Sequence, residues 1–339
     1  MKHPIINEYY KILSPEFPEF LIPYLQLPLL RRLDGIGLLC GTDWTALYQN
    51  KFFYSRLDHS VGVALIIWHF TKDRAQTLAG LLHDISTPVF SHVMDFRNND
   101  ALTQESTEEG NATMICKDEA LKALLKKDGI SVESVIDYHQ YPVADNKLPR
   151  LSADRLEYMF TTGMIMKGIW NLEEIETTYR DLKLMTNESG ETEIGFTTQS
   201  LAIDYCRKCC ETGLIMVENE NILTLSRLAR LSEMAIQKNM LEEADFYRLS
   251  EKAVITLFSE IEDREFRQYF QTFCKMQEII RADSVIEDSY CVCLAVKRRY
   301  IDPLWEGKRI SVISADVKQM IHSFLSFRDS AYAGVRLLK

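Results

Sequence analysis

An adjacent histidine and aspartate close an apolar stretch of this sequence and constrain how the chain can fold. Residues 75–84 repeat apolar side chains at helical spacing and end in His83 and Asp84. A buried helix face would take the Asp84 carboxylate out of water, which costs free energy unless another group compensates its charge. A metal ion would compensate it. The pair therefore predicts a helix that ends at a metal site.

Two further residues complete a candidate ligand set. His59 precedes the apolar segment 61–71, and Asp154 lies near the start of a predicted helix over residues 154–166. Taken alone, such residues are more often core histidines or helix caps. Together, two imidazoles and two carboxylates nearly balance a divalent cation and leave two octahedral positions open. We therefore expect one divalent ion (Mn, Fe, Ni or Zn, with Mg also compatible) held by His59, His83, Asp84 and Asp154.

Helical periodicity dominates the chain and predicts an all-α protein with minor β additions. The helical segments are 24–39, 61–71, 75–84, 119–127, 154–166, 201–216, 222–237, 242–249, 251–258, 265–282 and 315–327. A hairpin is expected where 182–185 and 193–196 flank a polar turn, and strands are expected over 290–300 and 309–314. The chain has 339 residues and exceeds one typical domain of about 100–150 residues. We expect a metal-binding helical domain over 1–200 and a C-terminal helical region with short strands over 201–339.

The composition is that of a globular protein and argues against several classes. Apolar residues make up 46% of the chain and charged residues 26%. No apolar run approaches the roughly 18 residues that span a bilayer, and the N-terminus lacks the apolar stretch of a secretory signal, so we expect a cytoplasmic protein without membrane contact. The net charge of −10 argues against binding of duplex nucleic acid, because neutralising phosphates needs clustered Lys and Arg. The eight irregularly spaced cysteines favour reduced thiols.

Four sequence strings resemble motifs of one family. The strings are 28–36 (PLLRRLDGI, resembling PxxQRLxxI), 56–63 (RLDHSVGV, resembling RFEHSLGV), 83–92 (HDISTPVFSH, resembling HDxGHxPFSH) and 153–158 (ADRLEY, resembling ADRLDY). These motifs belong to the HD-domain metal-dependent phosphohydrolases, and within them to the deoxynucleoside triphosphate triphosphohydrolase-like branch. The resemblance implies an HD-domain helical bundle and assigns the four candidate ligands to the metal.

The same resemblance implies which residues contact the substrate. Arg56 would bind a substrate phosphate, and Arg155 would help to neutralise it. Tyr158 would lie against the sugar or the phosphate.

It also implies which residues take part in the chemistry. His92 and Asp95 match a pair in which the acid orients a histidine that protonates the leaving oxygen. Their i, i+3 spacing on a helix permits that contact, although a neutral histidine at an exposed helix end is the ordinary alternative. Glu108 would orient the attacking water or a further residue.

Two positions depart from the family's pattern. Where the family has a histidine four residues after the HD pair, this chain has Thr87, and where a histidine opens HExG, Thr107 precedes Glu108. Both positions belong to the layer that handles phosphate. A threonine donates a hydrogen bond but carries no proton charge near neutral pH. We therefore expect Thr87 to contact the substrate through its hydroxyl, and the replacements put triphosphate cleavage in question.

Three functions are compatible with the sequence. The first is a metal-dependent phosphohydrolase that acts on a nucleotide or related phosphoester through a metal-activated water. The second keeps the metal but hydrolyses a nucleoside monophosphate, a cyclic nucleotide or another phosphoester. The third is a metal-containing nucleotide sensor or scaffold with little or no turnover, against which the retained proton-donor pair argues. The expected partners are a nucleotide or another phosphorylated small molecule and further copies of the chain, since the family forms oligomers.

Two smaller features have more than one interpretation. His139 could belong to a second metal site, although a histidine in a loop or at the surface is more common. The basic cluster Lys297-Arg298-Arg299 could contact an anionic effector or a neighbouring subunit, or form a solvated strand face.

Overall fold

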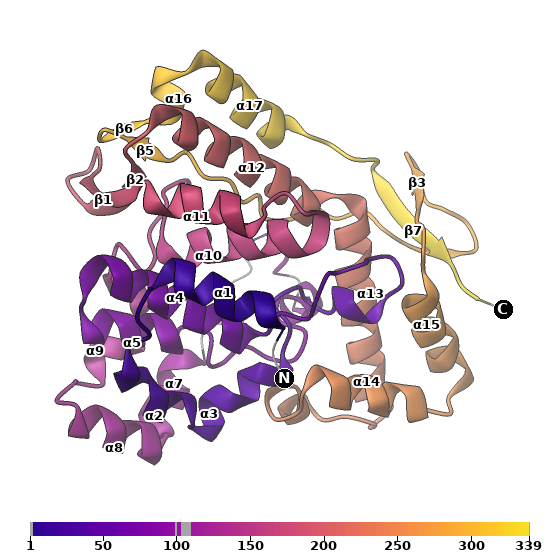
Figure 1. The fold of residues 1–339 in the computed structure, drawn as a ribbon. Coiled ribbons are helices and arrows are strands. Elements are labelled where there is room, and N and C mark those ends of the chain that lie inside the picture. The colour runs from indigo at the N-terminus through magenta and orange to yellow at the C-terminus, as the bar shows by residue number, and fades with distance from the viewer. Residues whose placement is uncertain (1–2, 99, 103–109, 339) are drawn as a thin grey trace.

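Helices make up most of the chain in the structure, a computed structural model that describes residues 3–98, 100–102 and 110–338 (Figure 1). In the first half they are α1 (Pro4–Leu13), α2 (Ile22–Leu25), α3 (Pro28–Arg31), α4 (Arg56–Thr71), α5 (Arg74–Leu82), α6 (Val93–Arg97), α7 (Asn111–Lys117), α8 (Glu119–Lys127), α9 (Glu133–Ile136), α10 (Ala153–Thr162) and α11 (Leu172–Arg180). In the second half they are α12 (Gln199–Val217), α13 (Asn219–Gln237), α14 (Glu251–Glu260), α15 (Arg264–Lys275), α16 (Ile310–Ile313) and α17 (Ala315–Ser326).

Helix α4 lies inside the molecule because its own apolar side chains are distributed around the whole helix. Its residues 56–67 are all buried, as expected for a helix without a polar face. Helices α1, α5 and α10 pack around it. Helix α5 comes close at Gly80, where a Cβ would overlap the side chain of Ile67. This packing places the C-terminal end of α5 beside the first turns of α4.

Two small sheets contain the strands. In the first, β1 (Leu182–Thr186) and β2 (Thr192–Phe196) form the predicted hairpin, and β2 pairs in parallel with β5 (Leu304–Trp305), which pairs with β6 (Lys308–Arg309). In the second, the antiparallel order is β3 (Ile280–Ala282), β7 (Tyr332–Arg336) and β4 (Ser289–Val292). Figure 1 shows the first sheet beside α12 and the second beside α13 and α15. The chain after α15 therefore contributes to both sheets: it supplies β5 and β6 to the first and all three strands of the second.

Two predicted helices are shorter than expected, and the one predicted over 242–249 is a 3₁₀ helix (Glu243–Tyr247). The segment 24–39 forms α2, α3 and a 3₁₀ turn (Arg32–Gly35) in place of one helix, because Pro28 has no N–H to donate and begins α3. The segment 265–282 is helical only to Lys275, and its last residues form β3.

The predicted strands near the C-terminus also differ. Only the first residues of the segment 290–300 lie in a strand, β4. The strand expected over 309–314 is wrong, because residues after Arg309 form α16. There the backbone N–H of Ser311 donates to the Asp302 carboxylate over 3.0 Å, which fixes a helical turn despite the β-branched side chains. Strand β7 was not predicted.

The apolar core crosses the predicted domain division. The largest buried cluster contains residues of α1, α4, α5, α10 and α12 together with Ile301, Val317 and Phe324 from the C-terminal part. A second cluster joins α6 to α13, α14 and α15. The division into 1–200 and 201–339 stays a prediction.

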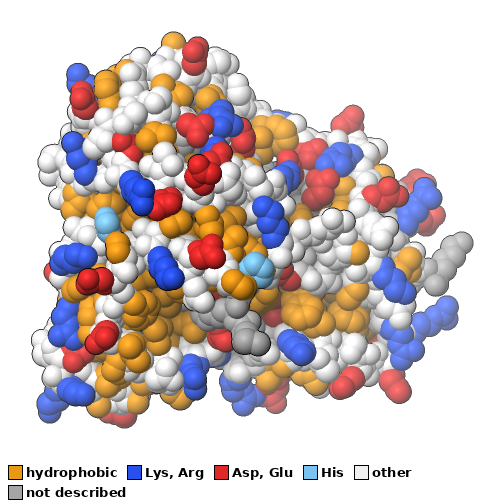
Figure 2. Space-filling model, in the orientation of Figure 1, with side chains coloured by type: hydrophobic (Ala, Val, Ile, Leu, Met, Phe, Trp, Pro, Cys, Tyr) orange, Lys and Arg blue, Asp and Glu red, His pale blue; other side chains and the backbone are white. Residues whose placement is uncertain are grey.

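The visible surface carries charges of both signs. Figure 2 shows Lys and Arg side chains interspersed with Asp and Glu over the face drawn there, without an extended basic area. Among the described residues, no helix is both long enough and apolar enough to cross a membrane.

Candidate metal centre

Helices α4, α5 and α10 bring the four candidate ligands together. His59 lies in the first two turns of α4, His83 is the C-cap of α5, and Asp84 follows it. Asp154 lies in the first turn of α10, whose N-cap is Ser152. Residues that are about 95 positions apart in the sequence (His59 and Asp154) thus meet at the ends of packed helices, as side chains of facing helices do in helical metal sites.

The ligand atoms of these residues lie within a few ångströms of one another. The Oδ1 atom of Asp154 is 3.1 Å from Nε2 of His59 and 3.8 Å from Nε2 of His83. The Oδ2 atom of Asp84 is 3.8 Å and 3.5 Å from the same two nitrogens. His59, His83 and Asp154 form a cluster that could hold one metal ion. The structure therefore gathers His59, His83 and Asp154 around one point, with the Asp84 carboxylate beside them.

Hydrogen bonds on the far side of both imidazoles orient them toward this point. Nδ1 of His83 donates to the backbone carbonyl of Gly80 over 2.7 Å. Nδ1 of His59 bonds to the carboxylate of Glu157, which is completely buried and also accepts from the Tyr54 hydroxyl over 2.6 Å. When Nδ1 carries the proton, Nε2 is free to bind a metal. These bonds turn the Nε2 atoms of both histidines toward the site.

The electrostatics of the cluster favour a cation. Burial lowers the pKa of His59, but the carboxylates of Glu157 and Asp154 outweigh this effect and raise it to about 10. Burial raises the pKa of Asp84, but Arg56 and the two histidines hold it well below its usual range. The buried carboxylates thus attract positive charge to the place where a divalent ion would bind. This donor set of imidazole nitrogens and carboxylate oxygens suits a transition metal.

Arg56 and Thr87 both bond to Asp84. The guanidinium of Arg56 donates to Oδ2 of Asp84 over 2.8 Å and to the Ser91 hydroxyl over 2.9 Å. The hydroxyl of Thr87 donates to Oδ1 of Asp84 over 3.0 Å. Arg56 lines the cavity at the site, whereas Thr87 is not among the described residues that line it. The substrate contacts expected of both residues stay predictions, and the observed contacts orient a candidate ligand.

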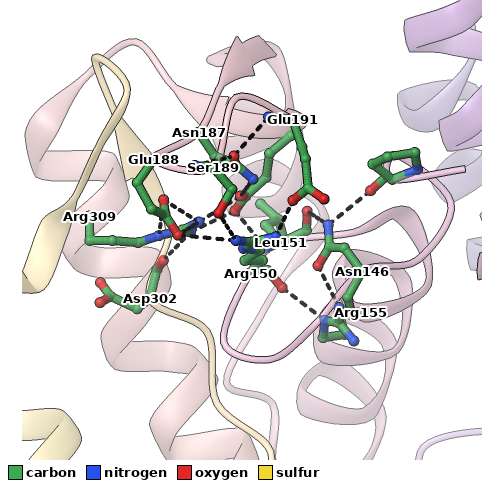
Figure 3. Close-up of polar contacts among 12 residues, drawn as sticks. Asn146, Arg150, Leu151, Arg155, Asn187, Glu188, Ser189, Glu191, Asp302 and Arg309 are labelled. Carbon is green, nitrogen blue, oxygen red and sulfur yellow. Dashed lines mark hydrogen bonds and ion pairs between the residues drawn. The ribbon is translucent and has the colours of Figure 1, made fainter.

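Arg155 and Tyr158 line the same cavity from α10. The Arg155 guanidinium bonds to Asn146, to the backbone carbonyl of Arg150 over 2.8 Å and to Asp145 over 2.9 Å. Its hydrogen-bonding groups thus hold the loop that precedes α10 (Figure 3). Tyr158 is half-buried, and burial raises its pKa.

The cavity has a volume of about 990 Å³ and contains the predicted proton donor. Nδ1 of His92 bonds to Oδ2 of Asp95 over 2.8 Å, which is the contact that the i, i+3 spacing permits. Asp95 is completely buried, and burial lowers the pKa of His92. His92 lines the cavity together with the candidate ligands. Glu108 and Thr107 lie outside the described residues.

The structure adds cavity residues that the sequence did not single out. The apolar part of the wall includes Leu38 and Leu39, Met166 from the π-helical turn after α10 (Gly163–Lys167), Ile215 and Met216 from α12, and Leu225 from α13. The sequence could have singled out Glu157, the partner of His59, because it lies one turn after Asp154 in the string ADRLEY (153–158). The apolar residues from α12 and α13 had no local signal.

His139 and two residues of the basic cluster 297–299 lie at the same cavity. His139 lines it and bonds to Asp137 over 2.9 Å, with Nε2 3.4 Å from Asp145. Lys297 and Arg299 line it from the C-terminal part, whereas Arg298 bonds to backbone carbonyls at the end of α17. The basic cluster is therefore divided between the cavity and the end of α17, in contrast to a solvated strand face.

Comparison with known proteins identifies relatives of part of the chain. No family model matches it. It is 31% identical to the uncharacterized protein YdhJ of Bacillus subtilis over 134 residues, 39% of this chain and 40% of that protein. It is 32% identical to the metal-dependent phosphohydrolase cns2 of Cordyceps militaris over 141 residues, 41% of this chain and 39% of that protein. The chain thus matches about two fifths of the length of these curated relatives.

Solved structures share the fold over nearly the whole chain. The phosphohydrolase BT4208 of Bacteroides thetaiotaomicron has a TM-score of 0.63 at 14% identity, covering 95% of this chain and 97% of that chain. A hypothetical protein of Aquifex aeolicus has a TM-score of 0.61 at 15% identity, covering 94% and 92%. The mostly helical fold of this chain surrounds a largely buried cluster of two histidines and two aspartates. About two fifths of this chain thus resembles a metal-dependent phosphohydrolase, and its fold is shared over nearly the whole length with a phosphohydrolase of known structure.

Proposed function

We propose that this chain is a metal-dependent phosphohydrolase that acts on a nucleotide or a related phosphoester. One observation carries the proposal. The Nε2 atoms of His59 and His83 and the carboxylates of Asp84 and Asp154 lie close together in the lining of a cavity that is also lined by His92, whose Nδ1 bonds to Asp95. A metal site and a proton donor in one cavity are the two parts that phosphoester hydrolysis needs.

A divalent metal ion fits the residues present and would be held by His59, His83, Asp84 and Asp154. When bound, it supplies a Lewis acid that polarises a phosphate oxygen and brings the pKa of water toward neutrality. Glu157 and the carbonyl of Gly80 would fix the tautomers of the two imidazoles.

The remaining residues would bind the substrate and move a proton. His92, oriented by Asp95, would protonate the departing oxygen, and Arg56 would bind phosphate beside Asp84. Arg155 and Tyr158 would line the path to the phosphate. Glu108 would orient the water.

The cavity supports a substrate of nucleotide size. Its volume of about 990 Å³ is at the upper end of the roughly 300–1,000 Å³ found for small-molecule sites. The apolar wall formed by α12 and α13 would accept a base or sugar, and the sequence resemblance favours the deoxynucleoside triphosphate branch. Because Thr87 donates to Asp84, a monophosphate or diester is an equally suitable substrate within this proposal.

Metal analysis and a phosphate-release screen test the proposal. The purified protein is expected to contain about one divalent metal ion, in line with a single set of nitrogen and oxygen ligands. Phosphate release is then measured with deoxynucleoside triphosphates, nucleoside monophosphates and model diesters. Asp154→Asn should lose both metal and turnover. His92→Asn should keep the metal and lose about 10²–10⁴-fold in kcat, the usual contribution of an acid catalyst.

Two outcomes would contradict the proposal. Full turnover in the metal-free Asp154→Asn variant would remove the metal from the reaction. A protein that binds metal and nucleotide but releases no product from any phosphoester would favour a nucleotide sensor or scaffold.

A further inference from the structure

Arg299 is a cavity-lining arginine whose guanidinium is unpaired within the described part of the chain. Within the described part of the chain, the arginines that line the cavity are Arg56, Arg155 and Arg299. Arg56 bonds to Asp84, and Arg155 bonds to Asp145. Among the described residues, the guanidinium of Arg299 makes no hydrogen bond or ion pair, although the residue is half-buried. A partly desolvated cation without a partner is costly unless a ligand pairs with it.

The backbone on both sides of Arg299 is anchored. Upstream, the N–H of Lys297 donates to the carbonyl of Ala101 over 3.2 Å, and Arg298 donates to the carbonyls of Phe324 and Phe327 over 2.8 and 2.6 Å. Downstream, the N–H of Asp302 donates to the carbonyl of Pro149 over 2.9 Å. These bonds come from three separate parts of the chain, so the segment is fixed at the cavity wall.

Further anchoring follows a few residues later. Ile301 is completely buried, and its carbonyl accepts from the Cys206 thiol over 3.1 Å. Arg309 donates to the carbonyl of Asp302 over 2.9 Å (Figure 3). It also pairs with the buried carboxylate of Glu193. A cationic group on a segment held in this way is preorganised, which lowers the entropy cost of binding an anion.

The charge of Arg299 acts on the part of the cavity where the proton donor lies. It lowers the pKa of His92, after the larger effect of burial, and it opposes the effect of burial on the pKa of Tyr158. Lys297 lines the same wall. An anion bound near His92 and Tyr158 would therefore meet positive charge from the C-terminal part of the chain.

We propose that Arg299 binds the phosphate group of the substrate beside His92. A phosphate dianion matches the planar fork of a guanidinium and its charge better than a neutral group does. This inference deepens the proposed function, on which it rests for the reaction of that phosphate. It means that residues beyond 200 complete the substrate site, and it assigns a role to the basic cluster.

Orthophosphate binding to the metal-loaded full-length protein tests the inference by isothermal titration calorimetry. Arg299→Gln is expected to raise the Kd for orthophosphate by about 10- to 100-fold, since a charge-assisted hydrogen bond is lost. Arg299→Lys should lie between Arg299→Gln and the wild type, because lysine keeps the charge without the fork. Arg267→Gln is the control, as it removes the same charge from an exposed position on α15 away from the cavity.

The binding measurement separates this inference from the proposed function. Orthophosphate binding that depends on Arg299 in a protein without turnover would support the inference and contradict the proposed hydrolysis. Equal Kd values for wild type and Arg299→Gln, or no binding of orthophosphate by the wild type, would overturn the inference whether or not the protein hydrolyses phosphoesters. Circular dichroism melting of both Arg299 variants confirms that they fold.

Discussion

At the scale of single residues, the proposed metal site depends on a carboxylate that does not face the metal position. Glu157 is completely buried and bonds to Nδ1 of His59, while the Tyr54 hydroxyl donates to its other oxygen over 2.6 Å. The α4 backbone comes close enough at Gly62 that a Cβ there would overlap Glu157. The glutamate is thus held in place by packing as well as by hydrogen bonds.

Glu157→Gln should weaken metal binding without removing a ligand. A neutral amide leaves the His59 imidazole less basic, and loss of such an outer partner typically lowers metal affinity by about 10- to 100-fold. Competition against a chromophoric chelator measures the change. Tyr54→Phe is the control, because it removes one hydrogen bond to Glu157 but keeps the charged partner of His59, and it should have the smaller effect. Wild-type affinity in Glu157→Gln would show that the carboxylate has no such role.

At the scale of one helix, a capping box begins α4 directly before two residues of the site. The Ser55 hydroxyl accepts from the N–H of Asp58 over 3.1 Å, and the Asp58 carboxylate accepts from the N–H of Ser55 over the same distance. The Tyr10 hydroxyl of α1 donates to the Asp58 carboxylate over 3.2 Å. The first turn of α4, with Arg56 and His59, is therefore fixed from two sides.

Ser55→Ala should lower the free energy of unfolding by about 1 kcal/mol, the usual value for loss of an N-cap side chain. Urea denaturation of the metal-free protein measures it, so that metal binding does not mask the change. Ser200→Ala serves as the comparison, since Ser200 is exposed in the first turn of α12 but is not the N-cap residue, which is Thr198. Equal destabilisation by both substitutions would mean that the cap contributes nothing specific.

At the scale of the whole molecule, a buried ion pair connects the C-terminal part to the hairpin. Arg309 makes two bonds of 2.7 Å to the completely buried Glu193 carboxylate. It makes further bonds to the exposed Glu188 (Figure 3). The same Glu193 accepts from the N–H of Leu151 over 3.0 Å. The pair thus joins β6, β2 and the loop before α10.

Arg309→Ala should destabilise the protein by about 3–5 kcal/mol, because removal of one partner leaves a buried charge unpaired. Thermal unfolding measured by circular dichroism gives the change. Arg180→Ala removes an exposed i, i+4 pair with Glu176 on α11 and should change the stability by less than about 1 kcal/mol. A small effect of Arg309→Ala would show that the C-terminal part is held by its apolar contacts alone.

A second long-range contact makes the stability depend on pH. Glu251 of α14 accepts from the N–H of Gly37 over 2.9 Å and from the Trp44 indole over 2.7 Å, and burial raises its pKa from 4.5 to about 7. Between these values the folded protein keeps a proton that the unfolded chain has lost, so stability falls as the pH rises from 4.5 to 7. The difference of about 2.5 pH units corresponds to about 3 kcal/mol at 1.36 kcal/mol per unit.

Urea denaturation at several pH values between 4.5 and 8 tests this assignment. Glu251→Gln should flatten the curve of unfolding free energy against pH within that window, since it removes the titrating group. Glu260→Gln, at an exposed position on the same helix, should leave the curve parallel to that of the wild type. Parallel curves for all three proteins would contradict the role of Glu251.

The sequence by itself determined the parts of the protein that depend on local spacing. Helical periodicity predicted α8 at its observed ends, and β-propensity with a polar turn predicted the β1–β2 hairpin. The adjacent His83 and Asp84, with motif resemblance for His59 and Asp154, predicted which side chains gather. The i, i+3 spacing of His92 and Asp95 fixed their contact. Each of these features is set by neighbours along the chain or by a short motif.

Tertiary structure decided the features that depend on contacts between distant segments. The Ser311–Asp302 contact turned a β-prone segment into α16, and Glu157 met His59 only because α10 packs on α4. Arg299 reached the cavity only because bonds to distant parts of the chain anchor its segment. Bringing distant segments together costs conformational entropy, and burial and hydrogen bonds between those segments offset this cost. Local sequence spacing does not show which distant segments will make these contacts. The sequence therefore predicted which side chains gather as candidate metal ligands, whereas the fold decided which groups surround them.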